Sequence, residues 1–280
     1  MRLRGVKGSR NIEDRRRAGG GRGRAAGGIG GVGLIVVLAI GYFAGIDVSP
    51  LLEGNNAPSQ PTGQISAQDE QAAQFTSSVL ATTEQVWSRV FAEQLNRTYN
   101  PPVLVLYSGV TQSPCGGASG ATGPFYCPAD QKAYLDTAFF ATMSQRLGAR
   151  GDFAAAYVIA HEVAHHVQFE LGVLQQVDQA RRRSSQTEAN QLTVRSELMA
   201  DCLSGVWARN VQGLMERGDL EEALNAARMI GDDHLQRQAG RVPQPHTFTH
   251  GTSAQRARWF NLGFDTGQVR QCDTFAADRL

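Results

Sequence analysis

The chain has 280 residues, 41% of them hydrophobic, which is enough for one large domain or two small ones. Its net charge of +1 averages over very unequal regions, so the charge alone identifies no class of partner. Residues 1–24 are rich in arginine and glycine and have too few apolar side chains to build a core. We therefore exclude them from the folded domain and expect a disordered basic arm.

Residues 25–46 predict a membrane-spanning helix, because the segment has no charged side chain and about 20 helical residues cross a bilayer. The alternatives are a buried core helix and a cleaved signal peptide. The arginines of the arm favour a cytoplasmic N terminus, which places everything after Asp47 outside the cytoplasm. The chain is then expected to be a single-pass protein of the inner or plasma membrane. Residues 47–63 predict a flexible linker.

Residues 64–280 are expected to form one domain of the α+β class, mostly helical with a small sheet or hairpin. Its first helix has Ser66 as a plausible N-cap, and a glycine-rich loop leads into a hairpin. The predicted helices are 65–95 and 137–147, and the predicted strands are 103–107, 125–127 and 132–135.

Four cysteines lie in this domain, and none has the C-x-x-C spacing of a structural zinc site. Outside the cytoplasm they can form disulfides, for which three connectivities exist; the alternative is four buried thiols. We favour the local pair Cys115–Cys127, which closes the glycine-rich loop. The remaining pair, Cys202–Cys272, would tie the C-terminal tail to a helix.

The stretch VIAHEVAHHVQF contains an H-E-x-x-H motif on a helix predicted over residues 152–172. His161 and His165 are four residues apart, so both rings can face one metal ion. Glu162 is rotated by about 100° and can lie beside the metal as a general base. His166 is rotated by about 100° from His165 and is not expected to bind the ion. An ordinary buried helix is the alternative interpretation.

A catalytic zinc site needs a third protein ligand. The three-histidine version of the motif is excluded, because Gln168 and Leu171 occupy its glycine and final histidine positions. Glu197, on a helix predicted around residues 195–208, is the candidate third ligand. Asp201, one turn later, can accept the other ring N–H of a ligand histidine, most simply His161. A solvated helix face is the alternative for both carboxylates.

Four motifs together resemble one known family: AHEVAHHVQ, ELMADCLSGVWA, GPFYCPADQKAYLD and FTHGTSAQRARWFNLGF. They are similar to the family of "putative neutral zinc metallopeptidases" of bacterial membranes, which are zincins of the H-E-x-x-H plus glutamate type. The resemblance covers nearly everything from about residue 64 to the C terminus, and the arm, span and linker match the family's layout. It implies zinc ligands at His161, His165 and Glu197, with Glu162 catalytic and Asp201 supporting.

The chemistry expected of such a site is peptide-bond hydrolysis, in which Glu162 takes a proton from water and passes it to the leaving amine. His250 is a candidate to stabilise the oxyanion, with Arg256 or Tyr126 behind it, although it could equally cap the following helix. An extended substrate could add to a strand edge at residues 125–127 or 103–107.

Two other functions stay open on the sequence alone. One is a zinc-dependent amidase acting on cell-wall peptides, and the other is a non-catalytic membrane-tethered domain with structural zinc. A structural site would need a fourth ligand, for which His250 and His246 are available. The expected partners are a peptide or protein substrate and the membrane. No nucleic acid is expected, because membrane orientation explains the arginines of the arm.

Overall fold

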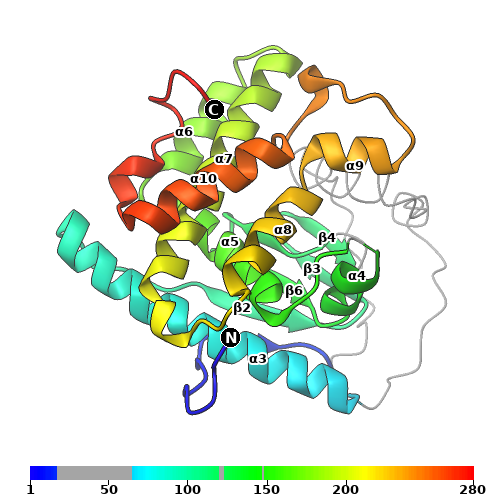
Figure 1. Cartoon of the computed structure of the whole chain (residues 1–280), viewed down its shortest axis with the longest axis vertical. Coiled ribbons are helices and arrows are strands. Elements are labelled where there is room, and N and C mark those ends of the chain that lie inside the picture. The colour runs from blue at the N-terminus through cyan, green and yellow to red at the C-terminus, as the bar shows by residue number, and fades with distance from the viewer. Residues whose placement is uncertain (18–64, 120–122, 147) are drawn as a thin grey trace.

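The computed structural model describes residues 1–17, 65–119, 123–146 and 148–280 (Figure 1). This part of the chain is of the α+β class and mostly helical, with one four-stranded and one two-stranded sheet. The predicted span and linker lie outside the described residues. Among the helices that the structure describes, none combines the length and apolar character needed to cross a membrane.

The first 17 residues are ordered, which corrects the prediction of a disordered arm for this part of residues 1–24. Strand β1 (Ile12–Asp14) pairs in parallel with β2 (Val103–Tyr107). Leu3 and Ile12 pack against the core of the domain. The segment has too few apolar side chains to build a core alone, but it folds by packing on the core formed by the rest of the domain.

The four-stranded sheet has the order β1-β2-β6-β5. Strands β2 and β6 (Lys132–Asp136) are parallel, and β5 (Phe125–Cys127) is antiparallel to β6. The predicted strand and the predicted hairpin are both confirmed. The glycine-rich loop contains a further hairpin, made of β3 (Val110–Ser113) and β4 (Gly116–Ser119), which the sequence analysis missed.

Helix α3 (Ala67–Val90) has Ser66 as its N-cap. The side chain of Ser66 accepts the backbone N–H of Asp69, and the side chain of Asp69 accepts that of Ser66. The helix continues into a π-helical turn, η1 (Phe91–Leu95). In Figure 1, α3 runs along the lower edge, and α7 and α10 lie in the upper half. The other helices are α4 (Phe139–Arg146), α5 (Asp152–Glu170), α6 (Val173–Arg181), α7 (Gln186–Asn210), α8 (Asp219–Met229), α9 (Asp232–Gln238) and α10 (Ser253–Thr266), with short 3-10 turns η2 (Gln212–Leu214), η3 (Pro245–Thr247) and η4 (Val269–Cys272).

Helices α7 and α10 touch through their backbones at two glycines. A Cβ atom on Gly263 would lie 1.8 Å from the carbonyl oxygen of Cys202, and one on Gly205 would lie 2.0 Å from that of Phe260. Only glycine allows so close an approach. The contact brings side chains of α10 directly against those of α7.

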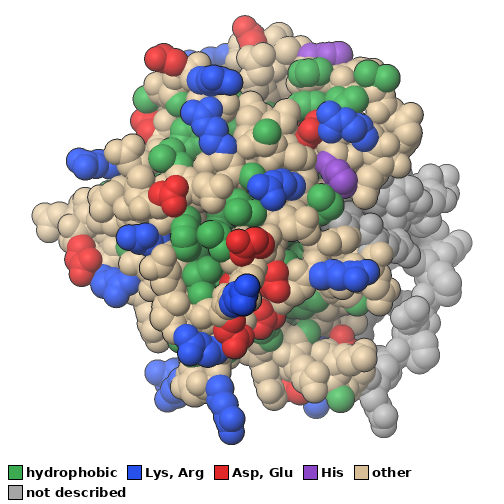
Figure 2. Space-filling view, viewed as in Figure 1, with side chains coloured by type: hydrophobic (Ala, Val, Ile, Leu, Met, Phe, Trp, Pro, Cys, Tyr) green, Lys and Arg blue, Asp and Glu red, His purple; other side chains and the backbone are tan. Residues whose placement is uncertain are grey.

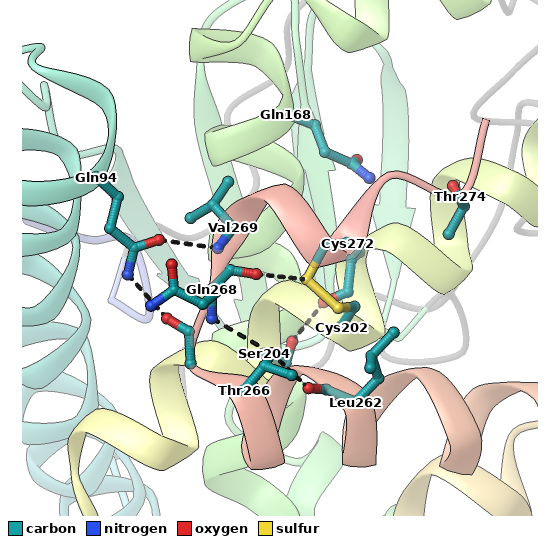
Figure 3. The surroundings of a disulfide bond; sticks show 12 residues. Gln94, Gln168, Cys202, Ser204, Leu262, Thr266, Gln268, Val269, Cys272 and Thr274 are labelled. Carbon is teal, nitrogen blue, oxygen red and sulfur yellow. Dashed lines mark hydrogen bonds between the residues drawn. A yellow bond between two sulfur atoms is a disulfide. The ribbon is translucent and has the colours of Figure 1, made fainter. Parts of the chain in front are cut away.

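Both predicted disulfides are present, Cys115–Cys127 and Cys202–Cys272. The second bond ties η4 to α7 (Figure 3). Gln94 anchors the same region to the end of α3, because its side chain donates to the carbonyl oxygen of Gly267 and accepts from the N–H of Val269, at 2.8 and 2.9 Å. The C-terminal segment is thus fixed from two sides.

Acidic side chains gather near the N terminus on the face shown in Figure 2. Asp152, Asp219 and Glu222 are close enough together to hold a cation. The Met1 ammonium group lies among them, 2.8 Å from Asp152 and 2.9 Å from Glu216. Burial alone would lower the pKa of this ammonium, but Asp152 and Glu216 outweigh it and raise the pKa to about 10. The ammonium therefore balances part of the negative charge.

Candidate metal centre

The H-E-x-x-H helix α5 faces α7, and three donor groups meet between them. Nε2 of His161 lies 3.0 Å from Oε2 of Glu197, and Nε2 of His165 lies 3.4 Å from Oε1 of the same carboxylate. Two ligands of a tetrahedral zinc ion, each at about 2.0–2.1 Å, are separated by roughly 3.3 Å. The donor types and their spacing therefore fit zinc.

Asp201 lies behind His161, where the sequence analysis expects it, with Oδ1 3.0 Å from Nδ1 of the ring. Although these two atoms are close, their geometry is not that of a regular hydrogen bond. Arg256 binds both oxygens of Asp201, through Nε at 2.8 Å and Nη2 at 2.9 Å, and the hydroxyl of Tyr157 donates to Oδ1. Arg256 and Asp201 are 1% and 0% exposed. Burial would raise the pKa of Asp201, but Arg256 and His161 outweigh it and hold the pKa below its usual value.

Gln168 has the corresponding place behind His165. Its Oε1 lies 2.9 Å from Nδ1 of His165, so Nδ1 donates, and its Nε2 donates to the carbonyl oxygen of Ser196 on α7 at 2.6 Å. With Nδ1 of each ligand histidine directed to its own partner, both Nε2 atoms face Glu197. This contact of Gln168 was not predicted from the sequence, where Gln168 serves only to exclude a three-histidine site.

Glu162 and the three donor groups line one cleft with a volume of about 650 Å³. Burial raises the pKa of Glu162, and the nearby rings of His165 and His161 oppose this in part. A carboxylate with a raised pKa suits proton exchange near neutral pH.

The wall of the cleft is mainly apolar, with strand β5 along one side. Within the described residues β5 pairs only with β6, so its other edge has no strand partner, and Phe125 and Tyr126 of this strand line the cleft. Strand β2 is not an edge, because β1 occupies its free side, which corrects the expectation for residues 103–107. The apolar lining includes Phe125, Phe139, Val158, Phe169, Leu174 and Val177.

His250 also lines the cleft, but the residue behind it is Asp232 rather than Arg256 or Tyr126. Nδ1 of His250 lies 3.2 Å from Oδ1 of Asp232, while Oδ2 accepts the backbone N–H of His250 at 2.6 Å. Burial would lower the pKa of His250, but Asp232 outweighs it and raises the pKa. Nothing in the sequence around Asp232 marks it as the partner of a histidine 18 residues later.

His166 points away from the three donors. Its Nε2 lies 2.6 Å from the carbonyl oxygen of Asn100, so Nε2 donates, and Nδ1 accepts from the hydroxyl of Tyr126 at 2.9 Å. Tyr126 belongs to β5, so His166 connects the metal-site helix to the edge strand. This contact also occupies Tyr126, which is why Tyr126 does not support His250.

The fold thus brings two histidines of an H-E-x-x-H helix and one glutamate together where they could hold a metal ion. The chain belongs to the family described as "putative neutral zinc metallopeptidase", whose family model matches residues 1–275. It is 48% identical to protein YpfJ of Escherichia coli (strain K12) over 98% of this chain and 99% of that protein. It is 41% identical to protein Rv2575 of Mycobacterium tuberculosis (strain H37Rv) over 65% of each chain. Both relatives are described as uncharacterized, and no solved structure matches the chain.

Proposed function

We propose that the protein is a zinc-dependent peptidase that hydrolyses peptide bonds with Glu162 as general base. The observation that carries this proposal is the convergence of two histidines and one glutamate beside Glu162 in a cleft. Among the residues that the structure describes, the group has three protein donors and no fourth. His250 is held by Asp232, and His246 is exposed. A zinc ion held by three protein ligands keeps its fourth coordination position for water, which supports a catalytic rather than a structural site.

In this proposal zinc, when bound, acidifies a water molecule and polarises the scissile carbonyl group. Glu162 takes the proton of the attacking water and later gives it to the leaving amine. His250 donates a hydrogen bond to the developing oxyanion, and Asp232 orients the ring from behind. Asp201 and Gln168 keep Nε2 of each ligand histidine directed into the site.

The cleft supports an extended peptide as substrate. The free edge of β5 offers backbone groups to a peptide strand, and the apolar lining offers contacts to its side chains. We also propose that the domain acts at a membrane, on the side outside the cytoplasm. The two disulfides are compatible with a domain outside the cytoplasm.

Metal analysis and peptidase assays of the full chain test this function. We expect about one bound zinc per chain and turnover of an apolar peptide mixture. Glu162→Gln should keep the zinc and lose about 100-fold or more in kcat, because it removes the base but no ligand. His250→Gln should lower kcat by about 100-fold with little change in KM.

The matched control is Glu93→Gln, which changes an exposed glutamate outside the cleft and should leave kcat unaltered. Full activity of metal-free protein, or of Glu162→Gln, would contradict the proposal. Including cell-wall peptides among the substrates distinguishes a peptidase from an amidase that uses the same residues.

A further inference from the structure

Arg181 is a half-buried cation in the cleft that lacks a partner. It is the last residue of α6 and lines the same cleft as the metal site. Its Nε atom is buried without a hydrogen-bond partner, and no carboxylate in the described part of the chain forms an ion pair with it. Burying a charged group without a partner is costly, so an anion in this place would be stabilised.

The neighbouring charges leave Arg181 uncompensated. Asp178 is one turn earlier on α6, but its Oδ2 pairs with the exposed Arg182 at 2.9 Å. Burial lowers the pKa of Arg181, and Asp178 opposes this only in part. Two other arginines line the cleft, and both are paired, Arg256 with Asp201 and Arg182 with Asp178. The charge available to a ligand is therefore that of Arg181.

Apolar side chains of α6 accompany this cation in the cleft lining. Leu174 and Val177 lie on the same face of α6 as Arg181 and also line the cleft. From Leu174 to Arg181 the helix rises by about 10 Å, which equals roughly three residues of an extended peptide. Because Arg181 is the one arginine of the cleft lining without a carboxylate partner in the described part of the chain, an anionic group of a bound peptide is placed at its end of the cleft.

We infer that Arg181 is a specificity site that binds a carboxylate of the peptide substrate, while Leu174 and Val177 contact apolar side chains nearer the metal. The carboxylate comes either from an acidic side chain or from the C terminus of the peptide. A guanidinium group can bind either one through two parallel hydrogen bonds. The inference rests on the proposed function, because it takes a peptide as the ligand of the cleft.

Peptide binding without turnover tests the inference separately from catalysis. The protein is the zinc-loaded full chain carrying Glu162→Gln, and binding is measured by fluorescence anisotropy. The probes are hexapeptides of alanine and leucine with either Glu or Gln at one position, each with a free or an amidated C terminus. We expect the carboxylate-bearing peptide of a matched pair to bind about tenfold more tightly, and this advantage to shrink in high salt.

Adding Arg181→Met should abolish the advantage while the zinc content stays the same, and Arg181→Lys should retain part of it. Arg183→Met is the matched control, since it removes an exposed arginine two residues away that does not line the cleft. An advantage confined to the Glu/Gln pairs identifies an acidic side chain as the ligand, and one confined to the free C terminus identifies the terminal carboxylate. Equal binding within all pairs, no binding of any peptide, or an advantage that survives Arg181→Met overturns the inference. Normal binding without cleavage by the unmodified protein would instead contradict the proposed function.

Discussion

The two histidines proposed as zinc ligands are supported by different chemistry. His161 faces a carboxylate that is itself bound by Arg256 and Tyr157, whereas His165 faces the neutral amide of Gln168. Both supporting residues depend on α7, because Asp201 belongs to this helix and Gln168 donates to the carbonyl oxygen of Ser196 on it. The orientation of both rings therefore depends on the packing of α5 against α7.

Arg256 should control metal affinity although it is no ligand. Arg256→Lys keeps a positive charge but loses the two-point contact with Asp201, so we expect the zinc dissociation constant to rise by about 10–100-fold. Arg256→Met leaves Asp201 buried without its cation and should also reduce the free energy of unfolding by roughly 3–5 kcal/mol. Chelator competition and denaturant titration measure the two effects.

Arg258→Met is the control for this pair of variants. Arg258 is on the same helix but exposed, and it lies over the ring of Trp259. Its loss should leave the zinc affinity unchanged. If Arg256→Lys binds zinc as tightly as the unmodified protein, Asp201 needs no arginine to orient His161.

Zinc binding should release protons, and its affinity should fall as the pH falls. In the metal-free site, burial would lower the pKa of His161, but Asp201 and Glu197 outweigh it and raise the pKa to about 10. The pKa of His165 is also raised, because Glu197 outweighs burial. The proton must leave before the ring can bind metal, so raised pKa values mean competition throughout the neutral range. Calorimetry at pH 7 in buffers of different ionisation enthalpy should show about one to two protons released. No release would mean that both rings are already neutral.

At the scale of helices, the contact between α7 and α10 positions the site. Helix α7 carries Glu197 and Asp201, and α10 carries Arg256. Gly263→Ala places a methyl group against the carbonyl oxygen of Cys202, which the backbone can avoid only if the helices separate. We expect a loss of roughly 1–3 kcal/mol or more in the free energy of unfolding, together with weaker zinc binding, because Arg256 is displaced from Asp201.

Gly213→Ala gives the matched comparison, since a Cβ atom at Gly213 meets no atom within 4 Å. This variant should keep both the melting temperature and the zinc affinity. A Gly263→Ala protein that loses stability but binds zinc normally would show that the helix contact supports the fold without positioning the site.

The elements that hold the three donors could be predicted from the sequence because their signals are local. The spacing of His161 and His165 follows from the helical repeat, and Ser66 and the hairpin around residues 128–131 follow from cap and turn preferences. The prediction of Glu197 as third ligand depended on a second helix, and on the lack of the glycine and histidine that a three-histidine motif would have after His165. Its place beside both rings agrees with that expectation, while its role as a ligand stays a prediction.

The supporting contacts could not be predicted, because each joins residues whose proximity only the tertiary fold creates. Asp232 is 18 residues from His250, and Arg256 is 55 residues from Asp201. Arg256 was expected behind His250 because the two are near each other along the chain, whereas it binds Asp201. Strand β1 was missed for the same reason, since its partner β2 is about 90 residues away.

At the scale of the whole molecule, the N-terminal segment is part of the domain. The family match begins at residue 1. The backbone N–H of Arg2 donates to Leu214, and the side chain of Asn11 donates to Glu84 on α3, at 2.7 and 2.8 Å. Residues 1–17 and 65–280 must therefore lie on the same side of any membrane while β1 is paired. This pairing and the predicted single crossing, with the arm inside and the domain outside, exclude each other in one molecule.

Thiol labelling of intact cells distinguishes the two arrangements. All four native cysteines are in disulfides, so Lys7→Cys and Arg279→Cys each introduce a single free thiol at an exposed position, one at each end of the chain. Because β1 belongs to the sheet, we expect a membrane-impermeant maleimide to label both variants to the same extent, before and after lysis. Labelling of Arg279→Cys in intact cells, but of Lys7→Cys only after lysis, would instead support the single crossing. In that case β1 would have to leave the sheet, and β2 would become a free edge beside the core.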